Sequence, residues 1–351
     1  MKQVALAIVI FYVLPLEVQA IGAVDLYEAQ VPVSNQTPEE QARAVKEAFQ
    51  KVLLKVMGNR RTLARAPLAL LLEKSSSLVQ KFRYNASDEE NGAATFWVRF
   101  DPLGVEQLLR QKALPVWGQV RPILLLWVAI EEGRHRYLVD ADGNLPAAEI
   151  LEEQAGVRGM PVILPLWDLE DRSQLSFSDI WGNFPEPILA ASKRYPASVQ
   201  LVGRLSRQSE DDWQARWTLY GVDKARDWRV NGEFEQVLRA GIDKSVDTIA
   251  AQIVPATGNN SLSSVQVRVT GVTSFMDYAR LFSYLSSLSQ VITMEPVQLS
   301  RAEAKFRLEL RGKAEGLATS IRFGRVLVRA TEGMGTNIEP NHMELNYRLL
   351  P

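Results

Sequence analysis

Cysteine is absent from this chain of 351 residues, and histidine occurs only twice, as His135 and His342. The missing thiols exclude disulfides, thiol catalysis and every metal site that uses cysteine. Two histidines are too few for a multi-histidine metal centre. A periplasmic bacterial protein of this size needs no disulfides, whereas an exported animal protein usually carries them. We therefore predict a bacterial source, and no bound metal or organic cofactor.

An excess of charge is also missing, and so are long apolar runs beyond the first twenty residues. The formal net charge is −1, which argues against a nucleic-acid partner because such a partner needs a net basic face. It also argues against strong, non-selective attraction to anionic lipid. The longest later apolar run, residues 122–130, is far shorter than the roughly 20 residues of a spanning helix. We expect no transmembrane helix in the mature chain.

Residues 1–20 have the three parts of a cleavable export signal. Lys2 supplies a positive start, residues 4–14 form an uncharged apolar run, and Pro15 breaks it. Val18 and Ala20 then place small residues at positions −3 and −1 of a cleavage site. The sequence therefore predicts cleavage after Ala20 and a periplasmic location.

Chain length and a linker-like segment divide the mature chain into three predicted modules of an α+β or α/β fold. A mature length of about 330 residues favours two or three domains. Residues 255–264 are rich in Pro, Thr, Gly, Asn and Ser, which is typical of a linker, and we expect a flexible joint at 258–263. We predict an N-terminal α+β domain at 21–118, a central mixed-sheet α/β sandwich at 119–257 and a C-terminal ferredoxin-like βαββαβ domain at 261–351.

Periodicity and capping signals place the elements within these modules. Thr37 and Glu40 form a capping pattern for a long helix that Gly58 ends. Ser274 and Asp277 form a second one. Alternating or continuous apolar residues predict strands. The expected helices are 37–58, 67–81, 105–113, 147–154, 187–194, 234–253, 274–288 and 315–323. The expected strands are 24–33, 95–100, 122–130, 136–139, 161–167, 199–206, 213–220, 228–230, 265–269, 290–297, 305–311, 325–328 and 344–350.

The sequence motifs of common metal, catalytic and nucleotide-binding sites are incomplete or absent. Residues 140–144 begin like a calcium loop, but Leu145 and Leu151 stand where that loop needs Gly and Glu. His135 lies between two arginines with no adjacent acid, so we interpret it as a surface residue. No nucleophile elbow, phosphate loop or dinucleotide fingerprint occurs.

Residues 168–187 are the most informative stretch for function. They form a predicted 20-residue loop after a buried strand, and loops of that length are uncommon and often functional. Its aromatic residues either pin the loop to its own domain or meet a partner. Its acids either cap a polar loop or form a catalytic pair at the carboxyl end of a strand. The partner-binding candidates are Phe177, Trp181 and Phe184, and the weaker acid candidates are Asp168, Glu170 and Asp171.

Five segments carry a family resemblance. They are VDLYEAQVPV at 24–33, ARAVKEAF at 42–49, VLLKVMG at 52–58, RPILLLW at 121–127 and PVILPL at 161–166. Together they resemble the domain-of-unknown-function family 2066 of exported Gram-negative proteins, which implies no assigned activity. The order of elements in the middle of the chain is more distantly similar to modules of curli secretion lipoproteins and to the amino-terminal part of Tol-system proteins, as an analogy of fold alone.

Two functions of different class follow from these observations. The first is a non-catalytic adaptor or binding protein of the cell envelope, whose partner is an envelope protein or cell-wall component. The second is a carboxylate-based hydrolase of envelope glycan, which would need two carboxyl groups about 5 to 10 Å apart in one cleft. The lack of a recognisable nucleophile or metal constellation favours the adaptor.

Overall fold

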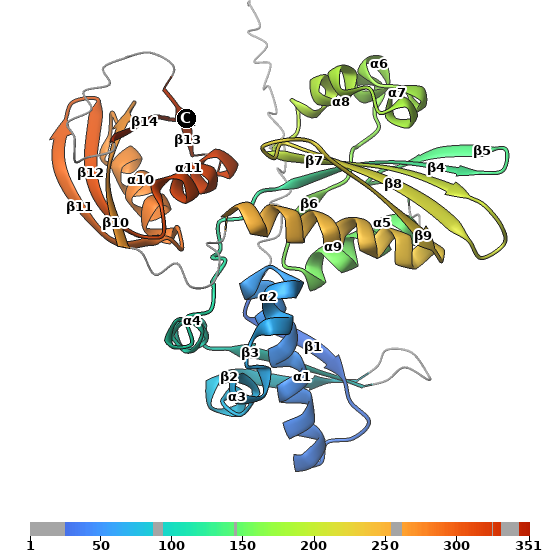
Figure 1. Ribbon diagram of the computed structural model, residues 1–351, viewed down its shortest axis with the longest axis horizontal. Helices are drawn as coiled ribbons and strands as arrows, with labels where there is room; N and C mark the ends of the chain where they lie inside the picture. Colours follow the sequence, from blue (N-terminus) through green and yellow to red (C-terminus); the bar gives the residue numbers. More distant parts are fainter. Residues whose placement is uncertain (1–24, 87–93, 144–145, 254–261, 325, 331–343) are drawn as a thin grey trace, which may run out of the picture.

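The computed structural model of the protein describes residues 25–86, 94–143, 146–253, 262–324, 326–330 and 344–351. It has the predicted α+β class, with three modules arranged in chain order (Figure 1). Each module has a sheet and a main hydrophobic cluster of its own. The predicted export signal, most of the 255–264 linker and His342 lie outside the described residues.

The N-terminal module packs helices against an antiparallel sheet of order β1-β3-β2. As predicted, the Thr37 hydroxyl accepts a hydrogen bond from the Glu40 amide, and Gly58 ends α1 in the left-handed region at φ 71°. The reciprocal half of the expected capping box is absent, because the Glu40 carboxylate accepts from the Ser34 amide instead of from Thr37. The elements are β1 (Glu28–Pro32), α1 (Pro38–Met57), α2 (Arg60–Arg65), α3 (Leu68–Leu72), the 3-10 turn η1 (Ser75–Leu78), β2 (Val79–Asn85), β3 (Thr95–Phe100) and α4 (Pro102–Gln111).

The helix predicted over residues 67–81 is wrong. The chain forms only the short α3 and η1 there, and then enters β2 at Val79. The Ser75 hydroxyl donates to the Leu72 carbonyl and the Ser77 hydroxyl to the Lys74 carbonyl, both at 2.7 Å. Because such local serine bonds compete with the helical ladder, the three consecutive serines at 75–77 mark the end of the helix rather than its interior.

The central module is built on a mixed sheet of order β5-β4-β7-β8-β9, with β6 paired to β4. Helices α5 and α9 cover one face, and α6, α7 and α8 cover part of the other (Figure 1). Strand β4 is buried from Leu124 to Ile130, as its unbroken apolar run predicted. The elements are β4 (Leu124–Glu132), β5 (His135–Val139), α5 (Pro146–Val157), β6 (Val162–Ile163), α6 (Leu169–Gln174), α7 (Phe177–Gly182), α8 (Pro185–Ser192), β7 (Val199–Arg207), β8 (Trp213–Tyr220), β9 (Arg226–Gly232) and α9 (Phe234–Ile253).

The buried strand predicted over residues 161–167 shrinks to the two residues of β6. Residues Val162 and Ile163 pair with the start of β4, while β5 pairs with its later residues from Val128 onward. Strand β5 thus occupies the edge along which β6 would have to continue. Pro165 stands two residues after β6 and offers no amide for a ladder. The apolar run therefore continues as irregular chain.

The C-terminal module has the predicted order βαββαβ, with one difference in its sheet. The strand order is β11-β12-β10-β14-β13, and β14 lies parallel to β10 between that strand and β13. A ferredoxin-like sheet would place β13 directly beside β10. The Ser274–Asp277 capping box of α10 is confirmed. The elements are β10 (Leu262–Thr270), α10 (Phe275–Ser287), β11 (Val291–Ser300), β12 (Glu303–Arg311), α11 (Ala314–Phe323), β13 (Leu327–Arg329) and β14 (Glu344–Leu349).

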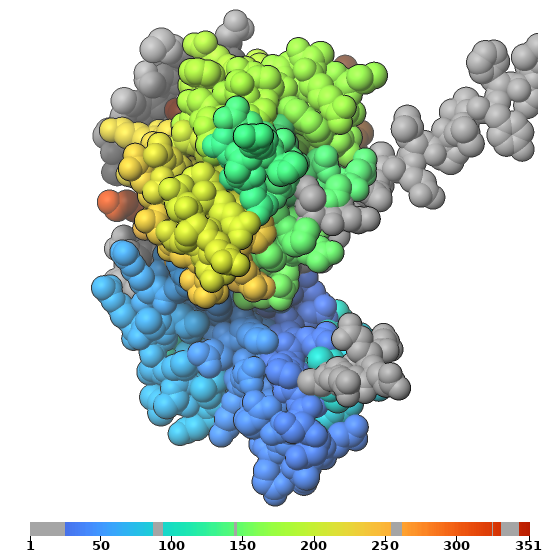
Figure 2. Space-filling view, turned by 90° about the vertical axis from the view of Figure 1, so that its right-hand side faces the viewer, coloured from blue at the N-terminus to red at the C-terminus, as the bar shows by residue number. Residues whose placement is uncertain are grey.

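The N-terminal module lies against the central module (Figure 2), and arginine side chains form polar contacts between them. Arg158 is fully buried and donates to the carboxylates of Asp243 (2.6 Å) and Asp247 (2.7 Å) on α9 and to the Gly58 carbonyl at the end of α1 (2.9 Å). Arg60, at the start of α2, pairs with the same two carboxylates from the other side. We call these four side chains the arginine joint.

Arg121 completes this contact without any acid. Its guanidinium donates to backbone carbonyls of Lys55 at 2.6 Å and Gly159 at 3.0 Å, and lies 4.2 Å from the centre of the Trp117 ring. Burial lowers the pKa of Arg121 to about 9, which still leaves it charged at neutral pH. A cation at the last carbonyls of α1 and just beyond the end of α5 complements the negative ends of two helices.

The central and C-terminal modules meet through apolar and amide contacts instead. The Phe323 side chain, at the end of α11, belongs to the central hydrophobic cluster. The buried Gln290 donates to the Ile253 carbonyl at 3.0 Å and to the Ser320 hydroxyl at 2.7 Å. Arg322 and Asp223 form an exposed pair at 3.2 Å. We call Phe323, Gln290 and Ser320 the amide joint. Within the described residues, no helix combines the length and apolar composition needed to cross a membrane.

Candidate functional site

The predicted loop at 168–187 is instead a compact helical insert, formed by α6, α7 and the start of α8. The Asp168 carboxylate caps α6, and Ser176 and Asp179 form a capping box for α7. Asn183 ends α7 in the left-handed region at φ 55°. Helices of six residues show no apolar period, but the Ser-x-x-Asp spacing of Ser176 and Asp179 is a start signal that would have revealed α7. We refer to residues 168–192 as the insert.

The three acid candidates gather around one arginine. Arg194 donates to Asp168 at 2.6 Å and to Asp171 at 3.0 Å, and lies 3.4 Å from Glu170. The Asp171 carboxylate is fully buried and also accepts from the Tyr195 hydroxyl at 2.5 Å and the Trp167 amide at 2.9 Å. Burial and then the hydrogen bond to Asp171 raise the pKa of Tyr195.

This arrangement gives the carboxylates structural partners. The hydrogen bond from Arg194 is the main reason that the pKa of Asp168 lies below its ordinary value. A general acid for glycoside hydrolysis needs a raised pKa, so Asp168 is tuned in the opposite direction. Asp171 has its oxygens occupied by three donors. The cluster therefore fastens α6 to the chain just after α8.

The aromatic candidates lie on the same insert but face different surroundings. The rings of Phe177 and Trp181 stack with centroids 5.5 Å apart, and Arg136 of β5 lies over Phe177. Both rings are partly buried against the cluster between the insert and the sheet. Phe184 is 55% exposed, and its ring lies against the backbone of Gly182. Of the three aromatic candidates, Phe184 is thus the one that is mostly exposed, while Phe177 and Trp181 pack on each other and on the sheet.

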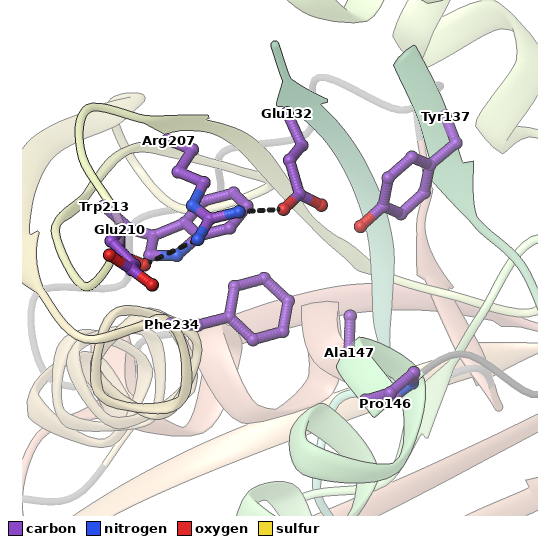
Figure 3. A pocket seen from close by; sticks show the side chains of 8 residues that line it. All are labelled: Glu132, Tyr137, Pro146, Ala147, Arg207, Glu210, Trp213 and Phe234. Carbon is purple, nitrogen blue, oxygen red and sulfur yellow. Dashed lines mark hydrogen bonds and ion pairs between the residues drawn. The ribbon is translucent and has the colours of Figure 1, made fainter. Parts of the chain in front are cut away.

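A separate cavity lies on the other face of the central sheet (Figure 3). Its volume is about 320 Å³, and aromatic rings of Trp213 and Phe234, with centroids 4.7 Å apart, form its apolar wall. The lining residues are Glu132, Tyr137, Pro146, Ala147, Arg207, Glu210, Trp213 and Phe234.

The polar rim of this cavity is held by one ion pair. Arg207 donates to the Glu132 carboxylate at 2.5 Å and to the Glu210 backbone carbonyl at 2.8 Å. Burial, and then the charge of Glu132, raises the pKa of Tyr137. The cavity can therefore hold an apolar or aromatic group whose polar end meets a neutral phenol and an occupied ion pair. From the sequence, Trp213 and Phe234 are recognisable only as members of apolar stripes. Their position beside Arg207 depends on strand pairing and helix packing, so the sequence did not predict the cavity.

No group of three or more His, Cys, Asp or Glu side chains that could hold a metal ion occurs among the described residues. His135 begins β5 and is exposed. Asp140 and Asp142, from the failed calcium pattern, stand in the turn after β5 and belong to no such group within the part of the chain that the structure describes.

Residues 20–118 match a family model described as a domain of unknown function, DUF8605. The match covers the N-terminal module and leaves the insert and the cavity outside it. It fits an uncharacterised domain, and it carries a different family number from the one that the sequence segments suggested. No curated protein matches the chain.

Proposed function

We propose that the protein is exported to the bacterial periplasm and acts there as a non-catalytic adaptor that binds an envelope protein or cell-wall component through the insert. The observation that carries this proposal is that the acid candidates of the insert have structural partners, whereas one of its aromatic rings is exposed. The acid candidates Asp168, Glu170 and Asp171 are engaged by Arg194, and Asp171 also by Tyr195. Phe184, in contrast, stays largely exposed. An exposed aromatic ring on a well-packed support is the arrangement expected of a binding anchor.

The frame behind the insert supports the same role. The insert rests on β4 and β7, and the same sheet contacts α9 on its other face. Because α9 also holds the arginine joint, a partner bound at the insert would be held in a set orientation to the N-terminal module.

We also propose that the whole chain belongs with family 2066, and that cleavage after Ala20 leaves Ile21 as the first residue. N-terminal sequencing of periplasmic protein would test the cleavage site.

Site-specific photo-crosslinking tests the binding role. A photoreactive phenylalanine analogue in place of Phe184 should crosslink a partner in intact cells. Phe82 of β2 is the matched control, because it is an exposed phenylalanine of similar exposure, 49%, on another module. A crosslinked product from position 184 and none from position 82 is expected. No product from position 184, or the same product from both positions, would contradict the proposal.

Substitutions of Trp181 and Phe184 distinguish a structural role of the insert from a binding role. Its ring is partly buried and stacked on Phe177, so Trp181→Ala should lower stability by about 1–3 kcal/mol, below the cost of a fully buried ring. Phe184→Ala should leave the melting temperature nearly unchanged and weaken partner capture about tenfold or more, as loss of an interface anchor does. If Phe184→Ala captures the partner as well as the wild type, the insert is scaffold alone.

A further inference from the structure

Three arginines stand side by side on the central sheet, on the face that carries the insert. Arg204 of β7 lies opposite Arg216 of β8, which lies opposite Arg229 of β9. The neighbouring pair Trp217 and Trp228 packs into the core beneath α9. Because successive side chains of a strand point to opposite faces, the arginines project from the other face. We call Arg204, Arg216 and Arg229 the arginine row.

The insert borders this row without covering it. Helix α7 contacts β4, β5 and β7, and the Tyr220 hydroxyl of β8 donates to Asn183 at the end of α7 at 3.2 Å. Arg216 and Arg229 are exposed, and Arg204, nearest the insert, is partly buried. The row therefore begins at the foot of the insert and runs outward across β8 and β9 (Figure 1).

The described residues leave the charge of the row poorly compensated. Arg204 reaches the Thr218 hydroxyl only at 3.5 Å, and its buried Nε has no partner among the described residues. Arg216 contacts Gln214 at 3.3 Å. The one acid in the next row, Asp227, accepts a hydrogen bond from Thr218 at 2.6 Å.

The row also carries mutual repulsion. Like charges directly opposite each other on neighbouring strands destabilise a sheet. Burial, followed by the charge of Arg216, lowers the pKa of Arg204, and the charge of Arg229 acts in the same direction. Asp227 and Tyr220 raise the pKa of Arg204, each less strongly than Arg216 lowers it but more strongly than Arg229 does. A bound anion would reduce this repulsion, so anion binding at this face should stabilise the protein.

The spacing of the row selects the kind of anion. Neighbouring strands are about 5 Å apart, so three guanidinium groups fall within about 10 Å of one another. An extended acidic peptide carries single charges about 6.5–7 Å apart on one face. Linked phosphates carry three or more charges in a smaller volume, and guanidinium groups bind phosphate oxygens in a bidentate manner.

We propose that the arginine row binds a small soluble ligand that carries linked phosphate groups. Arg204 would contact it at the foot of the insert, and Arg216 and Arg229 would hold its outer end. A flat bilayer is a poorer fit, because the insert rises beside the row and would hold the bilayer surface away from Arg204. The near-neutral net charge of the chain suits a local anion site rather than a broad basic surface. This proposal does not depend on the adaptor role.

Calorimetric titration of the full-length mature protein with pyrophosphate at about 50 mM salt tests the site, since low ionic strength preserves electrostatic binding. The wild type should bind one pyrophosphate, and the double variant Arg216→Gln/Arg229→Gln should bind it at least tenfold more weakly. Without ligand, the double variant should melt at the same or a higher temperature than the wild type, because repulsion is removed. This melting result shows that the variant is folded.

The matched control is Arg83→Gln/Arg307→Gln, which removes two exposed strand arginines from the other two sheets. It should bind pyrophosphate as the wild type does. Equal affinity in the arginine-row variant and the wild type would overturn the proposal, as would an equal loss in the control. Tighter binding of a hexaglutamate peptide, or of phosphatidylglycerol vesicles, than of pyrophosphate would overturn the choice of ligand.

Discussion

The arginine joint and the amide joint solve the same problem with opposite chemistry. Each fastens a neighbouring module to the central one, and each places a buried polar side chain at the contact. Arg158 meets two carboxylates and a backbone carbonyl. Gln290 meets one carbonyl and one hydroxyl, while Phe323 supplies the apolar contact. One joint depends on compensated charge, and the other on uncharged hydrogen bonds and a ring.

The two chemistries imply that the joints should fail in different ways. A buried ion pair adds little net stability when complete but is costly to break halfway. A neutral amide bond costs less to remove. The N-terminal module should therefore be fixed in one geometry and released abruptly, whereas the C-terminal module should tolerate small adjustments.

The largest effect is expected from Arg158→Met. Among the described residues, this change leaves the exposed Arg60 as the one cation paired with Asp243 and Asp247, and it removes the donor to the Gly58 carbonyl. Removing one partner of a buried pair costs about 3–5 kcal/mol, and urea unfolding would measure it. A cost below about 1 kcal/mol would show that the two joints do not differ in this way.

Gln290→Ala should have an intermediate effect at the amide joint. The Ile253 carbonyl loses its donor and the Ser320 hydroxyl loses a partner, at a cost of about 1–3 kcal/mol. Gln298→Ala, on the exposed edge strand β11, is the control and should change little. Proteolysis of the Gln290 variant should release a C-terminal fragment earlier than proteolysis of the control. Equal release from both variants would argue against a role of Gln290 at the joint.

Low pH should weaken the arginine joint, which contains carboxylates, but should leave the uncharged amide joint unaffected. Burial alone would raise the pKa of Asp247, but the charge of Arg158 and the hydrogen bonds from Arg60 and Arg158 outweigh it, so the pKa lies below its ordinary value of 3.8. A lowered carboxyl pKa contributes stability above the unfolded-state value, and that stability is lost as the pH falls towards the folded-state value. The stability difference between the wild type and Asp247→Asn should therefore shrink as the pH falls below about 4. A constant difference in denaturant unfolding across that range would contradict the expectation.

Arg60→Met should have the smallest effect. Its side chain is nearly half exposed, and exposed ion pairs contribute about 0–1 kcal/mol. Arg60 touches the same two carboxylates as Arg158, so this variant isolates burial as the cause of the larger loss. A cost equal to that of Arg158→Met in the same urea experiment would show that the two arginines act as one unit.

Elements with a long apolar period were predictable from the sequence, and contacts between distant segments were not. Helix α9 spans 234–253 as predicted, because its stripe repeats over five turns. The insert was missed because its helices are too short to show a period. The arginine row depends on the register of three strands, and the arginine joint brings Arg158 to a residue 85 positions away. The candidate residues of the insert were visible as residue types, but their division into engaged acids and an exposed ring follows from packing.

Helix α9 also imposes an order on folding. Arg60 finds its carboxylates 183 and 187 positions later in the chain, on the last helix of the central module. At about 5–20 residues per second of synthesis, that separation corresponds to roughly ten to forty seconds. During this interval the docking surface of the N-terminal module has no partner to bind. Loop closure over such a span slows assembly more than it lowers final stability, so docking of the N-terminal module should be the slow step of refolding.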